Sequence, residues 1–169
     1  YAVWVGLAFW LSFLLQFFYL LALHGAVPAT DSAAAHLFYL VYLALFSPVF
    51  FCLSEGGHPV SPAWGTLWKM LGWASLACLA AIAAILWWGA QLPALSLADR
   101  TTLLSRLAPY ALLLLNLGAV GIHWKHYRTS RNPLAGYFVA FLVISFWVSS
   151  AVIQSEREFD LAWFSYHLL

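Results

Sequence analysis

Long apolar runs, separated by short polar breaks, make up most of this chain. The runs cover residues 1–23, 33–53, 64–89, 107–127 and 134–155, and another begins at 161 and continues to 169. About 20 consecutive apolar residues are enough for a helix to cross the hydrocarbon core of a bilayer. The pattern therefore predicts an all-α fold in one domain, residues 1–169: a polytopic transmembrane helix bundle with five complete spans and the start of a sixth.

The polar breaks contain residues that end or begin helices. Pro28, Thr30 and Asp31 stand between the first two runs, and Asn132 with Pro133 stands between the fourth and the fifth. Proline lacks the backbone donor that a helix interior needs, while threonine, aspartate and asparagine cap helix starts. Because the chain begins without Met and the sixth run is short, we expect it to be part of a longer protein.

Two prolines fall inside apolar runs. Pro48 predicts a kink near Ser47, since it removes a backbone donor and crowds the carbonyl four residues earlier. Such a kink in a membrane helix serves either packing or a site, so Pro48 is a candidate position for a ligand or signal. Pro109 is expected to divide a short interfacial turn from the fourth span.

Composition places most of the chain in lipid. Of the 169 residues, 64% are hydrophobic and 8% are charged, whereas about a quarter of the residues in a soluble domain are charged. The formal net charge of +1 provides no basic surface for nucleic acid. A soluble protein and a nucleic-acid partner are therefore excluded, and membrane lipid is the expected partner.

Two sets of basic residues face opposite sides of the membrane if successive spans alternate in direction. One set is Lys69, Lys125, Arg128 and Arg131, and the other is Arg100, Arg106 and Arg157. Basic residues concentrate in the short loops on the cytoplasmic side of a membrane, and those close to a membrane boundary have the strongest influence on orientation. The larger set includes the cluster at residues 125–131, so we expect the N-terminus to be cytoplasmic.

The polar residues expected at mid-membrane depth are all neutral. They are Gln16, Ser47, Ser75, Asn116, Ser145 and Ser149. Pumps and ion transporters place ionisable side chains inside their spans, so transport is disfavoured. Asn116 is followed by Gly118 and Gly121, which predicts a close helix contact with an amide hydrogen bond across it. Asn116 is also a candidate position for sensing a ligand or signal.

Histidines are the candidate ligands for a metal ion or haem. His24 ends the first run, His36 opens the second, and His167 lies in the last, so the three can converge near the outer side. Haem or copper is the cofactor that this alternative implies, and the other interpretation is that the three are interfacial and helix-packing residues. His123 and His126 stand among basic residues, which predicts a wet, basic collar facing the lipid headgroups.

The C-terminal quarter carries a resemblance to a known family. Residues 128–169 contain a basic turn, an apolar helix, the acidic hinge of Glu156 and Glu158, and a final aromatic segment with His167. This arrangement resembles the end of the multi-span, membrane-associated sensor domains (MASE-like) that precede diguanylate cyclase and histidine kinase modules in bacteria. The resemblance implies a sensory or input role in the bacterial inner (plasma) membrane, with Trp163, Tyr166 and His167 as further signal-sensing candidates.

The same resemblance implies a cytoplasmic output domain beyond the last span, and a homodimer is compatible with it. The chain contains no Ser/His/Asp or Cys/His constellation, no phosphate-binding glycine loop and no carboxylate pair within a span. We therefore expect no catalytic activity in this segment. The alternative functions are a haem- or metal-binding subunit, or a purely structural subunit, of a membrane redox complex with other membrane subunits as partners.

Overall fold

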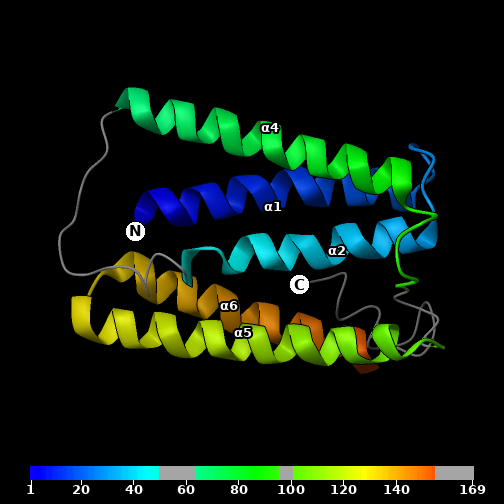
Figure 1. Ribbon diagram of the computed structural model, residues 1–169. Helices are drawn as coiled ribbons and strands as arrows, with labels where there is room; N and C mark the ends of the chain where they lie inside the picture. Colours follow the sequence, from blue (N-terminus) through cyan, green and yellow to red (C-terminus); the bar gives the residue numbers. More distant parts are fainter. Residues whose placement is uncertain (50–63, 96–100, 155–169) are drawn as a thin grey trace. The chain divides into compact units, whose positions relative to one another are not determined.

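The computed structural model describes residues 1–49, 64–95 and 101–154. Those residues form five α-helices and no strand, which confirms the predicted all-α class. The chain divides into two compact units, Tyr1–Pro93 and Ala94–Leu169. The first contains α1 (Ala2–Leu23), α2 (Asp31–Phe46) and α4 (Trp64–Trp88), and the second contains α5 (Leu103–Ser130) and α6 (Pro133–Gln154) (Figure 1).

The connection between α1 and α2 has strong stop and start signals. Gly25 follows the His24 cap with φ at +67°, the left-handed conformation that glycine adopts without a steric penalty. The backbone N–H of Gly25 donates to the Ala22 carbonyl, and that of Ala26 donates to the Leu21 carbonyl, as in a Schellman motif. Four residues later the Thr30 hydroxyl accepts from the Ala33 N–H at 3.2 Å and caps α2.

The second predicted span, residues 33–53, is interrupted in the structure. α2 ends at Phe46, and Ser47 forms a turn directly before the buried Pro48. This break lies where the proline predicted an interruption. Residues 50–53 of the predicted span lie outside the described residues. With 16 residues, α2 is about 24 Å long, less than the roughly 30 Å of a bilayer's hydrocarbon core.

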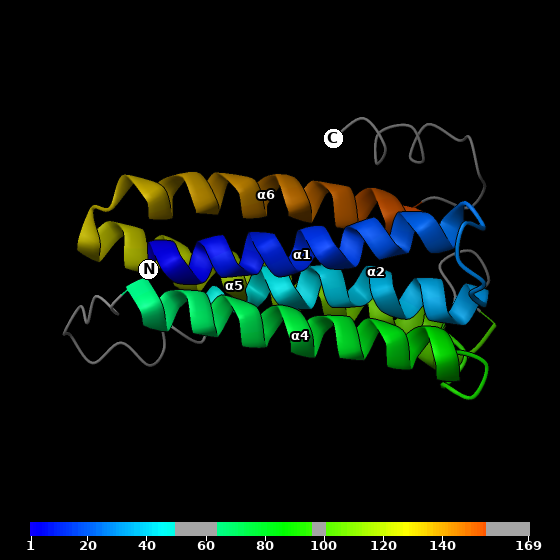
Figure 2. The same ribbon diagram turned by 90° about the horizontal axis from the view of Figure 1, so that it is seen from above.

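Within the first unit, α1, α2 and α4 lie side by side (Figures 1 and 2). The buried residues of α1 follow one another at steps of three and four: Val5, Ala8, Ser12, Leu15 and Tyr19. This spacing defines a seam of the coiled-coil kind, and α1 packs along it mainly against α2. The Ser12 hydroxyl donates to the Val41 carbonyl of α2 at 3.2 Å.

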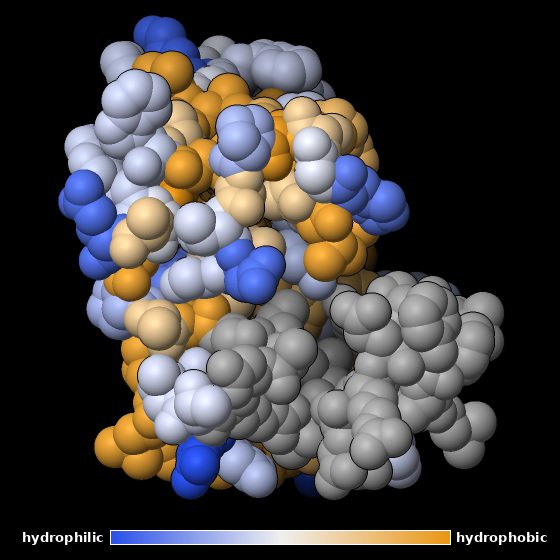
Figure 3. Space-filling model, turned by 90° about the vertical axis from the view of Figure 1, so that its right-hand side faces the viewer, coloured by the Kyte–Doolittle hydropathy of each residue, from blue (hydrophilic) through white to orange (hydrophobic). Residues whose placement is uncertain are grey.

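The end of α4 is fitted closely to the start of α2. A Cβ added to Gly89 would lie 2.6 Å from the Ala33 Cβ and 3.1 Å from the Thr30 hydroxyl oxygen. The Ser32 hydroxyl donates to the Pro93 carbonyl at 3.3 Å. Glycine at 89 is therefore required by the close approach of the two helices. Exposed polar residues such as Asp31 and Gln91 mark this end, and Figure 3 shows hydrophilic side chains there.

The second unit is an antiparallel helix pair. Thr102 caps α5, since its hydroxyl accepts from the Ser105 N–H at 3.1 Å. The helix then runs unbroken through Pro109, so the predicted interfacial turn at that proline is wrong. Pro109 occupies the second turn of α5, past the first four residues whose backbone donors lack partners, and membrane helices accommodate a proline at such interior positions. Asn132 begins α6, because its side-chain oxygen accepts from the Leu134 N–H at 3.0 Å.

Three helices, α1, α4 and α5, are long and apolar enough to cross a membrane. The chain is therefore a membrane protein with transmembrane helices. α2 and the fully described part of α6, Pro133–Val148, are apolar but shorter. Among the described residues, three helices are thus established as long and apolar enough to span, where the sequence predicts five complete spans. The incipient sixth span, 161–169, lies outside the described residues.

Candidate functional site

The predicted signal-sensing residues fall in separate places. Trp163, Tyr166 and His167 lie outside the described residues. Pro48 is fully buried at the end of α2 in the first unit, and Asn116 is fully buried on α5 in the second. Of the two described candidates, Asn116 makes a polar contact between helices, and we consider it first.

Asn116 inserts its amide into the backbone of the neighbouring helix. Its nitrogen donates to the Leu142 carbonyl at 3.1 Å, and its oxygen accepts from the Phe146 N–H at 3.2 Å and the Ser145 hydroxyl at 3.3 Å. With the amide reversed, the nitrogen would instead donate to the Ser145 hydroxyl at 3.3 Å and would face the Phe146 donor. The first orientation matches every donor with an acceptor, as a fully buried amide requires.

This contact confirms the predicted amide hydrogen bond between helices, but the role predicted for the nearby glycines is wrong. Gly118 and Gly121 have nothing within 4 Å of an added Cβ, so neither lies at a close approach. The buried side chains of α5 are Ser105, Pro109, Leu112, Asn116, Ala119 and His123. Steps of three and four keep this seam on one face of the helix, and both glycines lie off it.

His123 belongs to the same buried seam, so the predicted headgroup-facing collar is wrong for this residue. Its side chain is fully buried, and its ring meets the Phe138 ring of α6 edge to face with centroids 4.9 Å apart. The prediction that His123 faces the lipid headgroups was based on the basic residues next to it in the sequence. The helix register decides otherwise, because His123 lies seven residues after Asn116, two turns along the same face.

Two of the three histidines predicted to bind a metal or haem, His24 and His36, lie among the described residues. The Nδ1 atom of His24 lies 2.9 Å from the Leu20 carbonyl oxygen, and that of His36 lies 2.6 Å from the Ser32 carbonyl oxygen. A carbonyl can only accept, so each ring is protonated at Nδ1. No group of three histidine, cysteine or acidic side chains suited to a metal lies in the described part of the chain, and His167 falls outside it.

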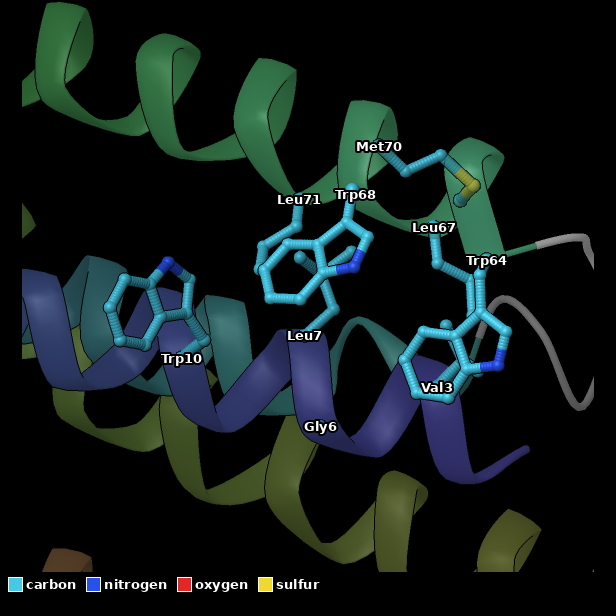
Figure 4. Close-up of a pocket in the computed structure, with 9 residues that line it drawn as sticks. All are labelled: Val3, Gly6, Leu7, Trp10, Trp64, Leu67, Trp68, Met70 and Leu71. Carbon is cyan, nitrogen blue, oxygen red and sulfur yellow. The ribbon is translucent and has the colours of Figure 1, made fainter.

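An apolar groove in the first unit is a concave site among the described residues. It has a volume of about 280 Å³ and lies between the first turns of α1 and α4. Its lining residues are Val3, Gly6, Leu7, Trp10, Trp64, Leu67, Trp68, Met70 and Leu71. Figure 4 shows three indoles, those of Trp10, Trp68 and Trp64, in a row along the seam between the two helices.

The groove presents hydrocarbon and aromatic surface almost throughout. The Trp10 indole N–H donates to the Ser75 hydroxyl at 2.8 Å, and that hydroxyl donates to the Leu71 carbonyl at 2.7 Å. This chain of hydrogen bonds fixes Trp10 against α4 and uses its single polar atom. The arrangement therefore suits an apolar ligand that makes no directional hydrogen bonds.

Sequence reasoning missed the groove. Its signal is the repetition of large apolar residues at helical spacing, Trp64 with Trp68 and Val3 with Leu7, but such repeats occur on every face of these helices. Only the pairing of α1 with α4 brings the two sets together. Comparison of the chain with models of protein families, with curated proteins and with solved structures finds no match.

Proposed function

We propose that this chain is a membrane-embedded sensory or input domain of a bacterial signalling protein. It lies in the inner membrane with its N-terminus in the cytoplasm, and it passes an apolar or membrane-derived signal to a cytoplasmic output module. In this proposal α2 and α6 complete a set of five spans, and the final aromatic segment with Trp163, Tyr166 and His167 leads to the output module.

The apolar groove between α1 and α4 is the observation that carries the proposal. Both helices are long and apolar enough to cross a membrane, so a site between them is accessible to apolar compounds dissolved in the bilayer. A concave, mostly apolar pocket is the usual form of a small-ligand site. The site is better suited to ligand binding than to catalysis, because its lining contains no acid, base or nucleophile.

The buried polar residues also favour sensing over transport. Among the described residues they are Ser12, Ser105, Asn116, His123 and Ser145. None is a carboxylate, a lysine or an arginine, and His123 is the single titratable side chain among them, whereas ion-coupled transporters and pumps usually use several ionisable groups along their pathway. Neutral contacts such as Asn116 with Ser145 hold helices together and leave no charged route across the membrane.

A sensor must distinguish two arrangements of its helices, since a ligand that binds both equally shifts neither. The test is the output of the full-length protein, including whatever its gene encodes after Leu169. We expect a signalling enzyme module there, and we expect its activity in lipid nanodiscs to change several-fold with the acyl composition of the lipid. Absence of such a module, or equal activity in all compositions, would contradict the proposal.

A further inference from the structure

We propose that the groove between α1 and α4 binds one acyl tail of a membrane phospholipid. This inference rests on the proposed function and deepens it by naming the ligand class, while the binding itself requires no output module. Three observations carry it: the dimensions of the groove, the chemistry of its lining, and the position of its tryptophans along the helices.

The groove has the size of a segment of a lipid acyl tail. Its lining extends from Val3 to Trp10 on α1 and from Trp64 to Leu71 on α4, about 10 Å along each helix. Its volume of about 280 Å³ is at the lower limit of small-molecule pockets, roughly 300 Å³. An α-helix with its side chains is about 10–12 Å across, too wide for this space, so a partner helix or a second copy of this chain is disfavoured.

Gly6 keeps the groove open on the side of α1. An added Cβ at this position would meet nothing within 4 Å, so the space beside the glycine is unfilled. Two membrane-spanning helices that left such a space empty would lose dispersion contacts along its walls. A hydrocarbon tail from the surrounding lipid restores those contacts without desolvating any polar group.

The tryptophans place the groove near one surface of the bilayer. Trp64 opens α4 and is 77% exposed, and Trp68 stands one turn later and is 65% exposed. Tryptophan is enriched at membrane–water interfaces, where its ring lies at headgroup level. The start of the groove is thus at the interface and its far end, at Trp10 and Leu71, is in hydrocarbon. A phospholipid has the same polarity along its length.

The test uses the 169-residue chain in lipid nanodiscs that contain a phosphatidylcholine with a photoreactive diazirine in one acyl tail. After illumination, mass spectrometry locates the adducts. We expect them to concentrate on the two segments 3–10 and 64–71. In Gly6→Leu, whose side chain fills the groove, the adducts on 64–71 should fall several-fold. Gly72→Leu is the matched control, because Gly72 also has no neighbour within 4 Å of an added Cβ but does not line the groove.

Gly6→Ala guards against misfolding of the larger variant, since its added methyl group clashes with nothing and should reduce the adducts in the same direction by a smaller amount. Adducts spread evenly over all lipid-facing helices, or an equal loss in Gly6→Leu and Gly72→Leu, would overturn the inference. Lipid-insensitive output with intact groove labelling would contradict the sensory function alone, while lipid-sensitive output without groove labelling would contradict this inference alone.

Discussion

At the scale of single residues, a few neutral polar groups connect helices that are otherwise apolar. Ser12 bonds to the Val41 carbonyl across α1 and α2, and Asn116 bonds to α6. In lipid the apolar faces gain no hydrophobic free energy from meeting each other, so packing and hydrogen bonds decide which faces pair. Each such bond therefore has more influence on the choice of partner than the many leucines around it.

The Asn116 contact gives a quantitative expectation. Replacing Asn116 by Leu should lower the free energy of unfolding by about 1 kcal/mol, since hydrogen bonds between membrane helices average about 0.6 kcal/mol and reach roughly 1.7 kcal/mol. Ser145→Ala and the double variant complete a cycle, in which the two changes should be non-additive. Reversible unfolding in mixed micelles measures these values.

Leu117→Ala is the control for this cycle, because Leu117 is next to Asn116 but 57% exposed. Its effect should stay within about 0.5 kcal/mol. Strict additivity of the Asn116 and Ser145 changes would show that the two side chains do not interact.

At the scale of elements, helix ends show where sequence signals and packing agree. Thr30, Thr102 and Asn132 cap α2, α5 and α6 with their own side chains, as residues of their type do. The end of α4 is different. Its glycine is explained by the nearby Ala33 and Thr30 of α2, a contact between segments more than 50 residues apart in the chain.

Gly89, directly after α4, should therefore be far less tolerant of a side chain than Gly72 in the middle of that helix. Gly89→Ala forces its Cβ against Ala33 and should cost about 1–3 kcal/mol of stability, the usual range for overpacking. Gly72→Ala meets no atom within 4 Å and should be neutral or stabilising by up to about 1 kcal/mol. Thermal unfolding of both variants, followed by circular dichroism, distinguishes them, and equal stabilities would disprove the close contact.

At the scale of the whole molecule, the direction of the spans is the property that function depends on. The basic cluster at residues 125–131 is at the end of α5, and basic residues at such a boundary favour the cytoplasmic side. If successive spans alternate in direction, as we propose, we expect the end of α4 on the opposite side and the N-terminus in the cytoplasm.

Cysteine labelling tests this orientation. In a Cys52→Ser, Cys78→Ser background, Thr129→Cys and Gln91→Cys introduce thiols at exposed positions, and the proposed topology predicts that they lie on opposite sides of the membrane. A membrane-impermeant maleimide should label the cysteine at 91 in right-side-out spheroplasts and the cysteine at 129 in inverted vesicles. Detergent-solubilised protein provides the control for complete accessibility. The reverse labelling pattern would invert the proposed topology and place the groove's tryptophans at the outer surface.

Much of the fold follows from local sequence. The positions of α1 and α4 agree with the apolar runs 1–23 and 64–89, and Thr30, Gly25 and Asn132 mark helix ends by their own chemistry. The sequence was less informative about how Pro48 and Pro109 affect the lengths of their helices. The same residue type coincides with the end of α2 and lies inside α5, because membrane helices tolerate an interior proline where the surroundings satisfy the freed backbone groups, so a proline alone does not mark a helix end.

The sequence by itself determined that this protein is helical and that lipid is the solvent of its longest helices, because apolar length and composition are local properties. The tertiary structure decided which faces meet: that His123 turns inward against Phe138, that Gly118 faces open space, and that α1 and α4 enclose a groove. A helix that is apolar on every side has no amphipathic pattern to mark its inner face. Shape complementarity and a few hydrogen bonds determine which face is buried. Both arise only when two helices pack together, so neither can be read from one helix alone.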